Sequence, residues 1–343
     1  MHIPENYLSP STCGIMSAAM LPVWYHAVKN VQRELPKEKL SLVGVGASFS
    51  FLVMMLNVPL IGGTTGHAVG GTLIALLFGP NAACIAVSVA LLLQAVIFGD
   101  GGILAFGANC FNMAFVLPFA GYYAYRLIVK CFGKGRESSG LHIAAAAAGS
   151  YIGLNLAALC AAVEFGIQPL LFTDSLGHAL YCPYGLNTAV PAMLIPHLAV
   201  AGFVEAAFTA AVYAFVRKVS PDLLFENIRN SSVTKSSHLP VFALAALMIA
   251  ASPLGLLAEG TAWGEWGADE IAEVVTDGSA LGYTPSGLAN GWTLRPLMPD
   301  YALEGMSETA AYILSAVIGA ALLIILFKLL TLALKDKNVR YDS

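Results

Sequence analysis

The chain has 343 residues, of which 57% are apolar (A, V, I, L, M, F, W, Y or C) and only 11% are charged, about half the ~25% of a soluble domain. Its mean hydropathy of +0.73 and its apolar runs of about the ~20 residues that cross a bilayer indicate a polytopic helical membrane protein. This composition excludes a soluble enzyme, a nucleic-acid-binding protein and a disordered chain. The net charge is −4, but in a membrane protein the positions of the charges along the chain say more than their sum.

Runs of low charge predict nine helices along the chain. The third run is too short to cross ~30 Å of hydrocarbon at about 1.5 Å per residue. It therefore either begins as a broken helix inside the Gly-rich turn 62–66 or forms a re-entrant piece. The predicted ranges are 9–28, 40–60, 68–79, 82–99, 108–127, 141–165, 189–216, 239–257 and 309–329.

Nearly all the basic residues fall into four clusters. With nine helices and the N-terminus outside, every cluster lies on the cytoplasmic side, as the positive-inside rule requires. Omitting the short third helix would put the first two clusters on opposite sides. The clusters are Lys29, Arg33, Lys37 and Lys39; Arg126, Lys130, Lys134 and Arg136; Arg217, Lys218, Arg229 and Lys235; and Lys328, Lys335, Lys337 and Arg340.

A polar stretch divides the chain into two modules. Residues 219–238 form a predicted cytoplasmic linker between a seven-helix bundle, residues 1–218, and a two-helix module, residues 239–343. The expected fold class is therefore all-α, a polytopic helical membrane protein. The loop between the last two helices is predicted to lie outside and to attract cations through its acidic residues, which are Glu259, Glu265, Asp269, Glu270, Glu273, Asp277, Asp300, Glu304 and Glu308.

Several familiar signatures are missing from the sequence. The P-loop pattern is absent, because Gly133-Lys134-Gly135 is followed by Arg136, so the chain is not expected to hydrolyse ATP by that route. No internal repeat supports an inverted-repeat transporter. The first 28 residues contain no Lys or Arg and so lack the charged region that opens a secretory signal. Met1 is therefore expected to stay the first residue of the mature chain.

Small residues recur along one face of the sixth predicted helix. Ala145, Gly149 and Gly153 are spaced four residues apart, a pattern that lets helices approach closely in lipid. They provide either packing within the bundle or a sliding surface for another membrane subunit.

A carboxylate and a histidine lie in the seventh predicted helix. Glu205 is mid-span, with His197 two turns earlier, and a buried carboxylate in a membrane span is a functional candidate. The two residues could carry coupling protons in a stand-alone secondary metal-cation transporter. A hydrogen-bonded pair or a contact to a partner helix would serve equally well.

The first two residues form a candidate metal chelator. The free amine of Met1, the backbone nitrogen of His2 and the Nδ1 of His2 can close on one metal ion in a five-membered and a six-membered ring. A fourth nitrogen would complete a square-planar set, the geometry of Ni(II) or Cu(II) rather than of Zn, Mg or Ca. Such a site needs a deprotonated amide and an unblocked amine, so its affinity should fall steeply in acid.

The predicted fourth donor is His67, which ends the stretch Gly62-Gly63-Thr64-Thr65-Gly66-His67. In the predicted topology it lies on the same side as the N-terminus. The glycines allow the backbone to fold tightly around a ligand, and Thr64 and Thr65 are candidates to orient the imidazole. A single histidine in a Gly-rich loop also has a purely structural interpretation.

At these residues the sequence resembles a known family, the substrate-binding membrane component of nickel and cobalt energy-coupling-factor (ECF) transporters, the CbiM/NikM family. The resemblance covers about residues 1–218 and rests on the following motifs: Met1-His2-Ile3-Pro4 with Leu8-Ser9-Pro10, Gly63-Thr64-Thr65-Gly66-His67, and Gly107-Ala108-Asn109-x-x-Asn112-Met113. The second module resembles the small auxiliary NikN-like subunit of that family. Its motifs are Ser252-Pro253-Leu254-Gly255-Leu256-Leu257 and Gly260-Thr261-Ala262-Trp263-Gly264-Glu265-Trp266.

The resemblance implies a site for Ni(II) or Co(II) as the transported substrate, formed by Met1, His2 and His67. Asn109 and Asn112 fall on the family motif and either tie the metal-binding loops together or only join helices. The resemblance also implies a multi-pass component of a prokaryotic cytoplasmic membrane that is not itself an enzyme. Its expected partners are a scaffold transmembrane T component and cytoplasmic ATPase subunits.

Overall fold

The computed structural model describes residues 1–133, 138–228, 236–276 and 278–333. Part of the predicted linker, residues 229–235, lies outside this range. The following charged residues of the predicted clusters and of the acidic loop lie outside it as well: Lys134, Arg136, Arg229, Lys235, Asp277, Lys335, Lys337 and Arg340.

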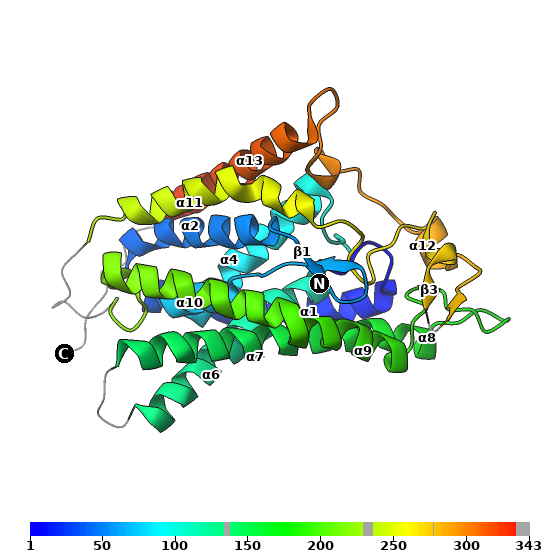
Figure 1. Ribbon diagram of the computed structural model, residues 1–343, viewed down its shortest axis with the longest axis horizontal. Coiled ribbons are helices and arrows are strands. Elements are labelled where there is room, and N and C mark those ends of the chain that lie inside the picture. The colour runs from blue at the N-terminus through cyan, green and yellow to red at the C-terminus, as the bar shows by residue number, and fades with distance from the viewer. Residues whose placement is uncertain (134–137, 229–235, 277, 334–343) are drawn as a thin grey trace.

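The predicted all-α membrane fold is confirmed, because helices occupy each of the nine predicted ranges (Figure 1). The helices of the first module are α1 (Pro10–Glu34), α2 (Lys37–Met54), α3 (Gly71–Phe78), α4 (Pro80–Leu93), α5 (Phe106–Asn109), α6 (Leu117–Phe132), α7 (Ser139–Gly166), α8 (Gln168–Leu171), α9 (Leu186–Pro196) and α10 (Gly202–Val219). Three π-helical segments continue these helices, Gln94–Phe98, Cys110–Val116 and His197–Ala201.

The second module contains α11 (Leu239–Ala251), α12 (Ser286–Asn290) and α13 (Glu308–Ala333). Short 3-10 helices lie at Pro221–Leu223, Ser252–Leu257, Ile271–Glu273 and Pro299–Tyr301. Two antiparallel hairpins complete the described chain, β1 (Val58–Leu60) with β2 (Thr64–Gly66) and β3 (Val275–Thr276) with β4 (Ser279–Ala280).

Among the described residues, five helical stretches are long and apolar enough to cross a membrane, namely Pro80–Phe98, Ser139–Leu171, Leu186–Val219, Leu239–Leu257 and Glu308–Ala333. The number of crossings and the orientation of the N-terminus stay predictions. The second predicted range, 40–60, is wrong at its end, because α2 stops at Met54 and Val58–Leu60 form β1. The Gly-rich turn 62–66, just before the third range, is not helical either, since it closes the β1–β2 hairpin in which Leu60 pairs with Thr64. Helix α3 starts only at Gly71 and has 8 residues, about 12 Å of helix, which is too short to cross.

The linker region joins the ends of several elements through one carboxylate. Asp222 lies 2.7 Å from the ammonium of Lys39 and 3.0 Å from Nε2 of His238. Burial opposes its charge, but the hydrogen bonds from Lys39 and His238 outweigh burial and hold the pKa of Asp222 at about 2. The starts of α2 and α11 therefore meet the end of α10 at one end of the protein.

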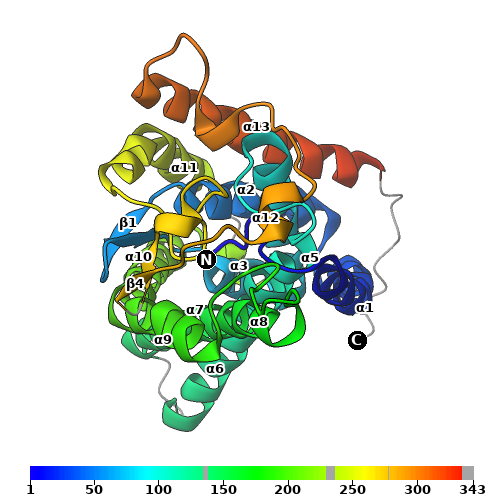
Figure 2. The ribbon, with the colours of Figure 1, turned by 90° about the vertical axis from the view of Figure 1, so that its right-hand side faces the viewer.

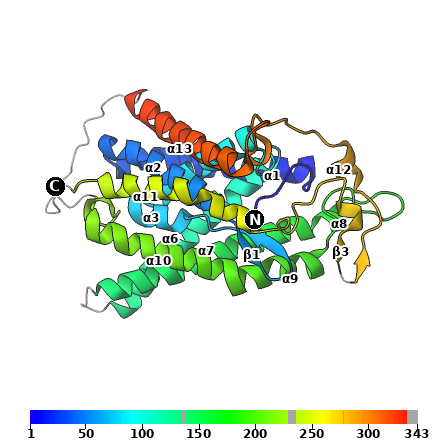
Figure 3. The ribbon, with the colours of Figure 1, turned by 45° about the horizontal axis from the view of Figure 1, so that its top comes forward.

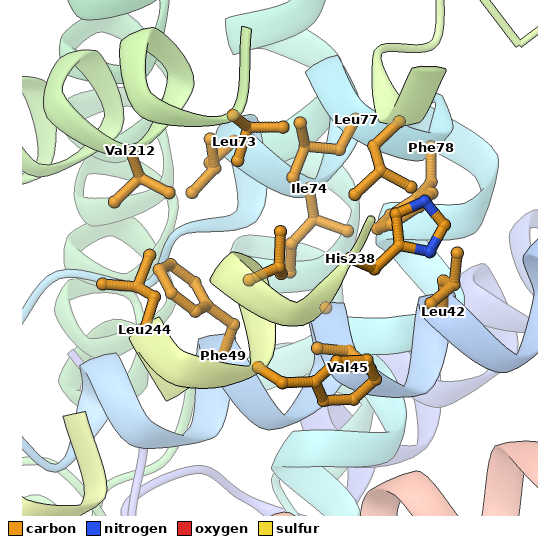
Figure 4. A pocket seen from close by; sticks show the side chains of 15 residues that line it. Leu42, Val45, Phe49, Leu73, Ile74, Leu77, Phe78, Val212, His238 and Leu244 are labelled. Carbon is orange, nitrogen blue, oxygen red and sulfur yellow. The ribbon is translucent and has the colours of Figure 1, made fainter. Parts of the chain in front are cut away.

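The two modules pack against each other rather than standing apart. Helix α13 lies along α2, as Figures 1 and 3 show, and its Tyr312 donates a hydrogen bond to the Met55 carbonyl. Ser48 of α2 donates to the Ala320 carbonyl of α13. Beneath α11 lies an apolar cavity, lined by residues such as Phe49 and Ile74 and bordered by His238 (Figure 4).

The small residues of α7 face α6 within the bundle. A Cβ at Gly149 would lie 2.5 Å from the Gly121 carbonyl oxygen, and a Cβ at Gly153 would lie 2.5 Å from the Leu117 carbonyl oxygen. Ala145 is fully buried. These contacts favour packing within the bundle over a sliding surface for another subunit.

We expect Gly149→Ala to lower the stability of the protein by about 1–3 kcal/mol, because the added methyl group overpacks the α6–α7 contact. Thermal unfolding in detergent measures the change. Gly140→Ala is the matched control, since a Cβ there meets nothing closer than 3.6 Å. Equal melting temperatures for the two variants would contradict the close approach.

Candidate metal centre

The N-terminal segment, residues 1–9, lies behind the end of the protein that carries α8, α12 and β3–β4, which we call the loop end, and its start lies beside β1 at the centre of the end-on view (Figures 1 and 2). The residues Met1, His2 and Ile3 are buried, with exposed fractions of 4%, 2% and 0%. The chain start is thus packed inside the protein.

The side chain of Asn109 holds this segment through two hydrogen bonds to the backbone of Ile3, as a neighbouring β-strand would. Its Oδ1 accepts from the Ile3 amide at 2.8 Å, and its Nδ2 donates to the Ile3 carbonyl at 3.0 Å. The Gly102 amide donates to the same carbonyl at 2.8 Å. Both polar groups of a fully buried backbone residue are therefore satisfied.

The loop after the fourth predicted helix is shaped to receive the segment. The carboxylate of Glu5 accepts hydrogen bonds from the amides of Ile103 and Leu104. Gly101 has a φ of +87°, and a Cβ there would lie 3.3 Å from the ring of His2. Glycine is suited to this position because it adopts positive φ readily and lets the imidazole approach the backbone.

Two imidazole nitrogens face each other at the start of the chain. The Nδ1 of His2 lies 3.2 Å from the Nε2 of His67, and the ring centroids are 4.9 Å apart. The Nδ1 of His67 lies 3.1 Å from the Ala68 carbonyl, which can only accept, so this nitrogen carries the hydrogen. The Nε2 of His67 therefore presents a free lone pair toward His2.

Glu205 holds the backbone that follows His67. Its buried carboxylate accepts hydrogen bonds from the amides of Val69 at 2.8 Å and Gly70 at 3.1 Å. His197 donates from Nδ1 to the Met193 carbonyl of its own helix at 2.7 Å. The structure therefore places Glu205 where it positions the loop of a predicted metal ligand.

An acidic residue of the second module meets the chain terminus. The Met1 amine lies 3.4 Å from Oε1 of Glu265, and the backbone amide of His2 also faces this carboxylate. Burial raises the pKa of Glu265, and the positive charge of the amine opposes that rise. One member of the predicted cation-attracting loop is thus in direct contact with the candidate site.

Sequence reasoning missed three further residues around His2. Asp100 lies 3.1 Å from Nδ1 of His2 through its Oδ1, and its Oδ2 accepts hydrogen bonds from Gln94 and Tyr301. Gln94 is fully buried. The one available signal was its polar side chain inside the apolar run Ala90–Phe98, since polar groups in membrane spans mark functional sites.

Both imidazoles are neutral at physiological pH. Burial, followed by the charge of the N-terminal amine, lowers the pKa of His2 to about 3. The same two causes hold the pKa of His67 well below its usual range. Neutral imidazole is the form that binds metal.

The residues predicted to orient His67 or to tie the metal-binding loops together make the following contacts. Thr64 pairs with Leu60 in the β1–β2 hairpin, and the Thr65 hydroxyl donates to the Gly260 carbonyl of the second module at 3.4 Å. Asn112 donates to Glu164 of α7 at 2.8 Å. Asn109 contacts the N-terminal segment, as described above.

Comparison with known proteins places the chain in a family. Residues 2–223 match the model of the cobalt uptake substrate-specific transmembrane region, CbiM. The chain belongs to this family. Residues 236–336 match a second model, the PDGLE domain.

Relatives of the whole CbiM-family chain are fused proteins. It is 48% identical to a probable fused nickel transport protein LarMN of Lactiplantibacillus plantarum, over 96% of this chain and 97% of that one. It is 44% identical to the fused nickel transport protein NikMN of Rhodobacter capsulatus, over 94% and 95% of the two chains.

A solved structure resembles the first part of this CbiM-family chain. The crystal structure of a truncated transition metal transporter superposes with a TM-score of 0.59 at 50% sequence identity. The match covers 63% of this chain and 98% of the other.

We expect Asn109→Leu to release the N-terminal segment, because it removes both hydrogen bonds to Ile3. Two buried hydrogen bonds contribute about 2 kcal/mol together, so the Ile3 amide should exchange about 30-fold faster in hydrogen–deuterium exchange. Asn155→Leu is the control, since Asn155 donates to Tyr151 of its own helix. Unchanged exchange at Ile3 in the Asn109 variant would show that other contacts hold the segment.

Proposed function

We propose that this protein binds Ni(II), with Co(II) as the competing ion, and passes it across the cytoplasmic membrane of a prokaryote. The proposed ligands are the Met1 amine, the backbone nitrogen and Nδ1 of His2, and Nε2 of His67. The observation that carries the proposal is the buried convergence of these nitrogens at the loop end. The names of its relatives, fused nickel transport proteins, support the choice of ion.

The distance between the imidazoles suits a square-planar ion. Metal–imidazole bonds of about 2 Å put neighbouring nitrogens of a square plane about 2.8 Å apart. The His2 backbone nitrogen belongs to both chelate rings, so the fourth ligand lies opposite to it and beside Nδ1. The observed Nδ1–Nε2 separation of 3.2 Å is close to that value and needs only a small movement.

Geometry and donor type give the proposed site its selectivity. Four nitrogens in one plane favour Ni(II) and Cu(II), while Mg²⁺ and Ca²⁺ take oxygen ligands and higher coordination numbers. Glu265 and Asp100 border the site with side chains that are 24% and 22% exposed. Their negative charges favour the arrival of a divalent cation from solvent.

Transport in this proposal depends on partners. The protein acts as the substrate-specificity component of an ATP-driven ECF transporter, with a scaffold T component in the membrane and ATPase subunits in the cytoplasm. It is not an enzyme, and the missing P-loop leaves ATP hydrolysis to those subunits. Four further residues position the loops that carry the metal ligands without binding the metal themselves, namely Thr64, Thr65, Asn109 and Asn112.

The alternative, a stand-alone secondary transporter that uses Glu205 and His197, has less support. The Glu205 carboxylate accepts from two backbone amides, and His197 is bonded to its own helix. These contacts favour structural roles for both residues. Reconstituted vesicles separate the two functions, since the alternative requires uptake without the scaffold and ATPase subunits.

We expect one added residue before Met1 to abolish metal binding. The extension turns the amine into an amide and displaces the terminal nitrogen, so the three-nitrogen chelate is lost. The measurement is nickel content with visible absorption: the native protein should hold one diamagnetic, square-planar nickel, and the extended protein none.

A conservative replacement away from the N-terminus is the control for loss of metal during purification. Met16→Leu keeps the terminus intact and should leave nickel content unchanged. If the extended protein binds as well as the native one, or if the native protein binds nothing, the N-terminal site is wrong.

We expect the apparent nickel affinity to fall by up to about 100-fold per pH unit below neutrality. Binding releases one proton from the amine and one from the His2 amide, and two released protons give this slope. With its pKa at about 3, the His2 imidazole adds nothing until far lower pH. Nickel titrations between pH 5 and 8 measure the slope, and a slope near zero would exclude backbone nitrogen ligands.

A further inference from the structure

We propose that Gln94, held in place by Tyr301 of the second module, accepts the Nε2–H of His2 when the metal takes Nδ1. Gln94 and Tyr301 are thus positioning residues for the ligand His2. This inference rests on the proposed function, because it concerns how His2 becomes a ligand. It gives the second module a part in the metal site.

The first step concerns the hydrogen of His2 in the metal-free protein. Its Nδ1 lies between two acceptors, Oδ1 of Asp100 at 3.1 Å and the lone pair on Nε2 of His67 at 3.2 Å. Two acceptors on one nitrogen require that it carry the hydrogen. A neutral imidazole has one such hydrogen, so Nε2 of His2 has none.

The second step concerns two buried atoms without partners. Among the described residues, Nε2 of His2 and Oε1 of Gln94 are buried and make no hydrogen bond. The two side chains belong to one cluster around Asp100, whose Oδ1 lies 3.1 Å from Nδ1 of His2 and whose Oδ2 accepts from Nε2 of Gln94 at 3.1 Å, and the hydrogen-bonding side chain of Gln94 acts to raise the pKa of His2. In the metal-free state both atoms are acceptors, and this explains why they are unpaired.

Metal binding resolves this conflict. When the ion bonds to Nδ1, the hydrogen leaves that nitrogen and Nε2 takes one up, so the imidazole stays neutral and only its tautomer changes. Nε2 is then a donor facing the free Oε1 of Gln94. Ligating histidines commonly donate their other N–H to an acceptor that fixes the ring, and Gln94 supplies that acceptor here.

The third step concerns what orients Gln94. Its Nε2 donates to Oδ2 of Asp100 and to the Tyr301 hydroxyl, both at 3.1 Å. An amide group whose nitrogen is held in this way must present its oxygen on the other side. The ring of Tyr301 stacks on Phe98 with centroids 4.7 Å apart, and its hydroxyl donates to Asp100.

This network crosses between the modules. Gln94 begins a π-helical segment in the first module, where such segments often mark functional sites. Tyr301 ends a 3-10 helix in the second module. The second module therefore helps to hold the acceptor that is proposed to receive the Nε2–H of His2.

The test compares nickel binding by full-length variants in detergent. We expect Gln94→Met to lower nickel affinity about 10- to 100-fold, the range for lost outer partners of a ligating histidine, and to shift the visible absorption of the bound ion. Tyr301→Phe should lower affinity about 10-fold. The double variant should bind no more weakly than Gln94→Met, because both changes act through one imidazole.

Tyr312→Phe is the matched control. Tyr312 is a buried tyrosine of the second module whose ring lies 5.4 Å from that of Tyr301, and its hydroxyl donates to the Met55 carbonyl, outside the site. Tyr301→Phe loses two hydrogen bonds, with Gln94 and Asp100, and Tyr312→Phe loses one, so without metal both should fold and Tyr301→Phe should melt at a somewhat lower temperature. Only Tyr301→Phe should lose nickel affinity.

The outcomes separate this inference from the proposed function. If Gln94→Met and Tyr301→Phe bind nickel as tightly as Tyr312→Phe with the same spectrum, the inference is wrong and the N-terminal site stands. If the native protein binds no nickel, or if an N-terminal extension leaves binding intact, both are wrong. Should Gln94→Met fail to fold, Tyr301→Phe against Tyr312→Phe still decides.

Discussion

A charged chain terminus inside the protein is the constraint on which the loop end depends. Burying an ammonium group without a counter-charge is strongly unfavourable, and Glu265 lies 3.4 Å from the Met1 amine. The loop of the second module must therefore fold back over the N-terminus. In the proposed site a divalent ion replaces two protons, one from the amine and one from the His2 amide. The net charge next to Glu265 is then the same before and after binding, so one carboxylate stabilises both states without changing its partner.

The same constraint explains why the two modules form one structure. The N-terminal segment is fixed to the first module by Asn109, whereas its charge is balanced from the second module. The Thr65 hydroxyl of the β1–β2 hairpin donates to Gly260, so the strand that leads to His67 also contacts the second module. Helix α13 packs along α2, and hydrogen bonds from Tyr312 to the Met55 carbonyl and from Ser48 to the Ala320 carbonyl join the two. Fusion in one chain keeps these contacts together without a separate association step.

The sequence predicted well what depends on local rules. Apolar runs located the helices. The chemistry of an N-terminal Met-His, with a histidine after a Gly-rich stretch, singled out His2 and His67, and the structure places Nδ1 of His2 3.2 Å from Nε2 of His67.

The sequence did not predict Gln94, Asp100 or Tyr301, because their partners are distant in the chain: Tyr301 lies 201 residues from Asp100. That Thr64 and Thr65 orient His67 stays a prediction, and the sequence did not predict that the Ala68 carbonyl accepts from Nδ1 of His67 at 3.1 Å. For Glu205 the sequence left a coupling role, a hydrogen-bonded pair and a contact to a partner helix open, because a mid-span carboxylate shows no sign of the backbone amides from which it accepts. Runs of low charge also did not separate the β1–β2 hairpin from helix, because its strands have only three residues each.

The separate anchoring of the ligands determines how an ion can leave. In the proposed site three of the four nitrogens belong to the chelate of the first two residues, which is bound to the loop 100–109 through Asn109 and Glu5. The fourth belongs to His67, whose following backbone is bound to α10 through Glu205. A movement of α10 relative to that loop would withdraw His67 and leave the chelate whole, so one metal–nitrogen bond is broken first.

Converting a site from 99% bound to 99% released requires about 5.5 kcal/mol of differential free energy. A three-nitrogen chelate exposed to water and to competing protons is weaker than the closed site, and in the proposed transporter the partner subunits would supply the remaining free energy by stabilising the open arrangement.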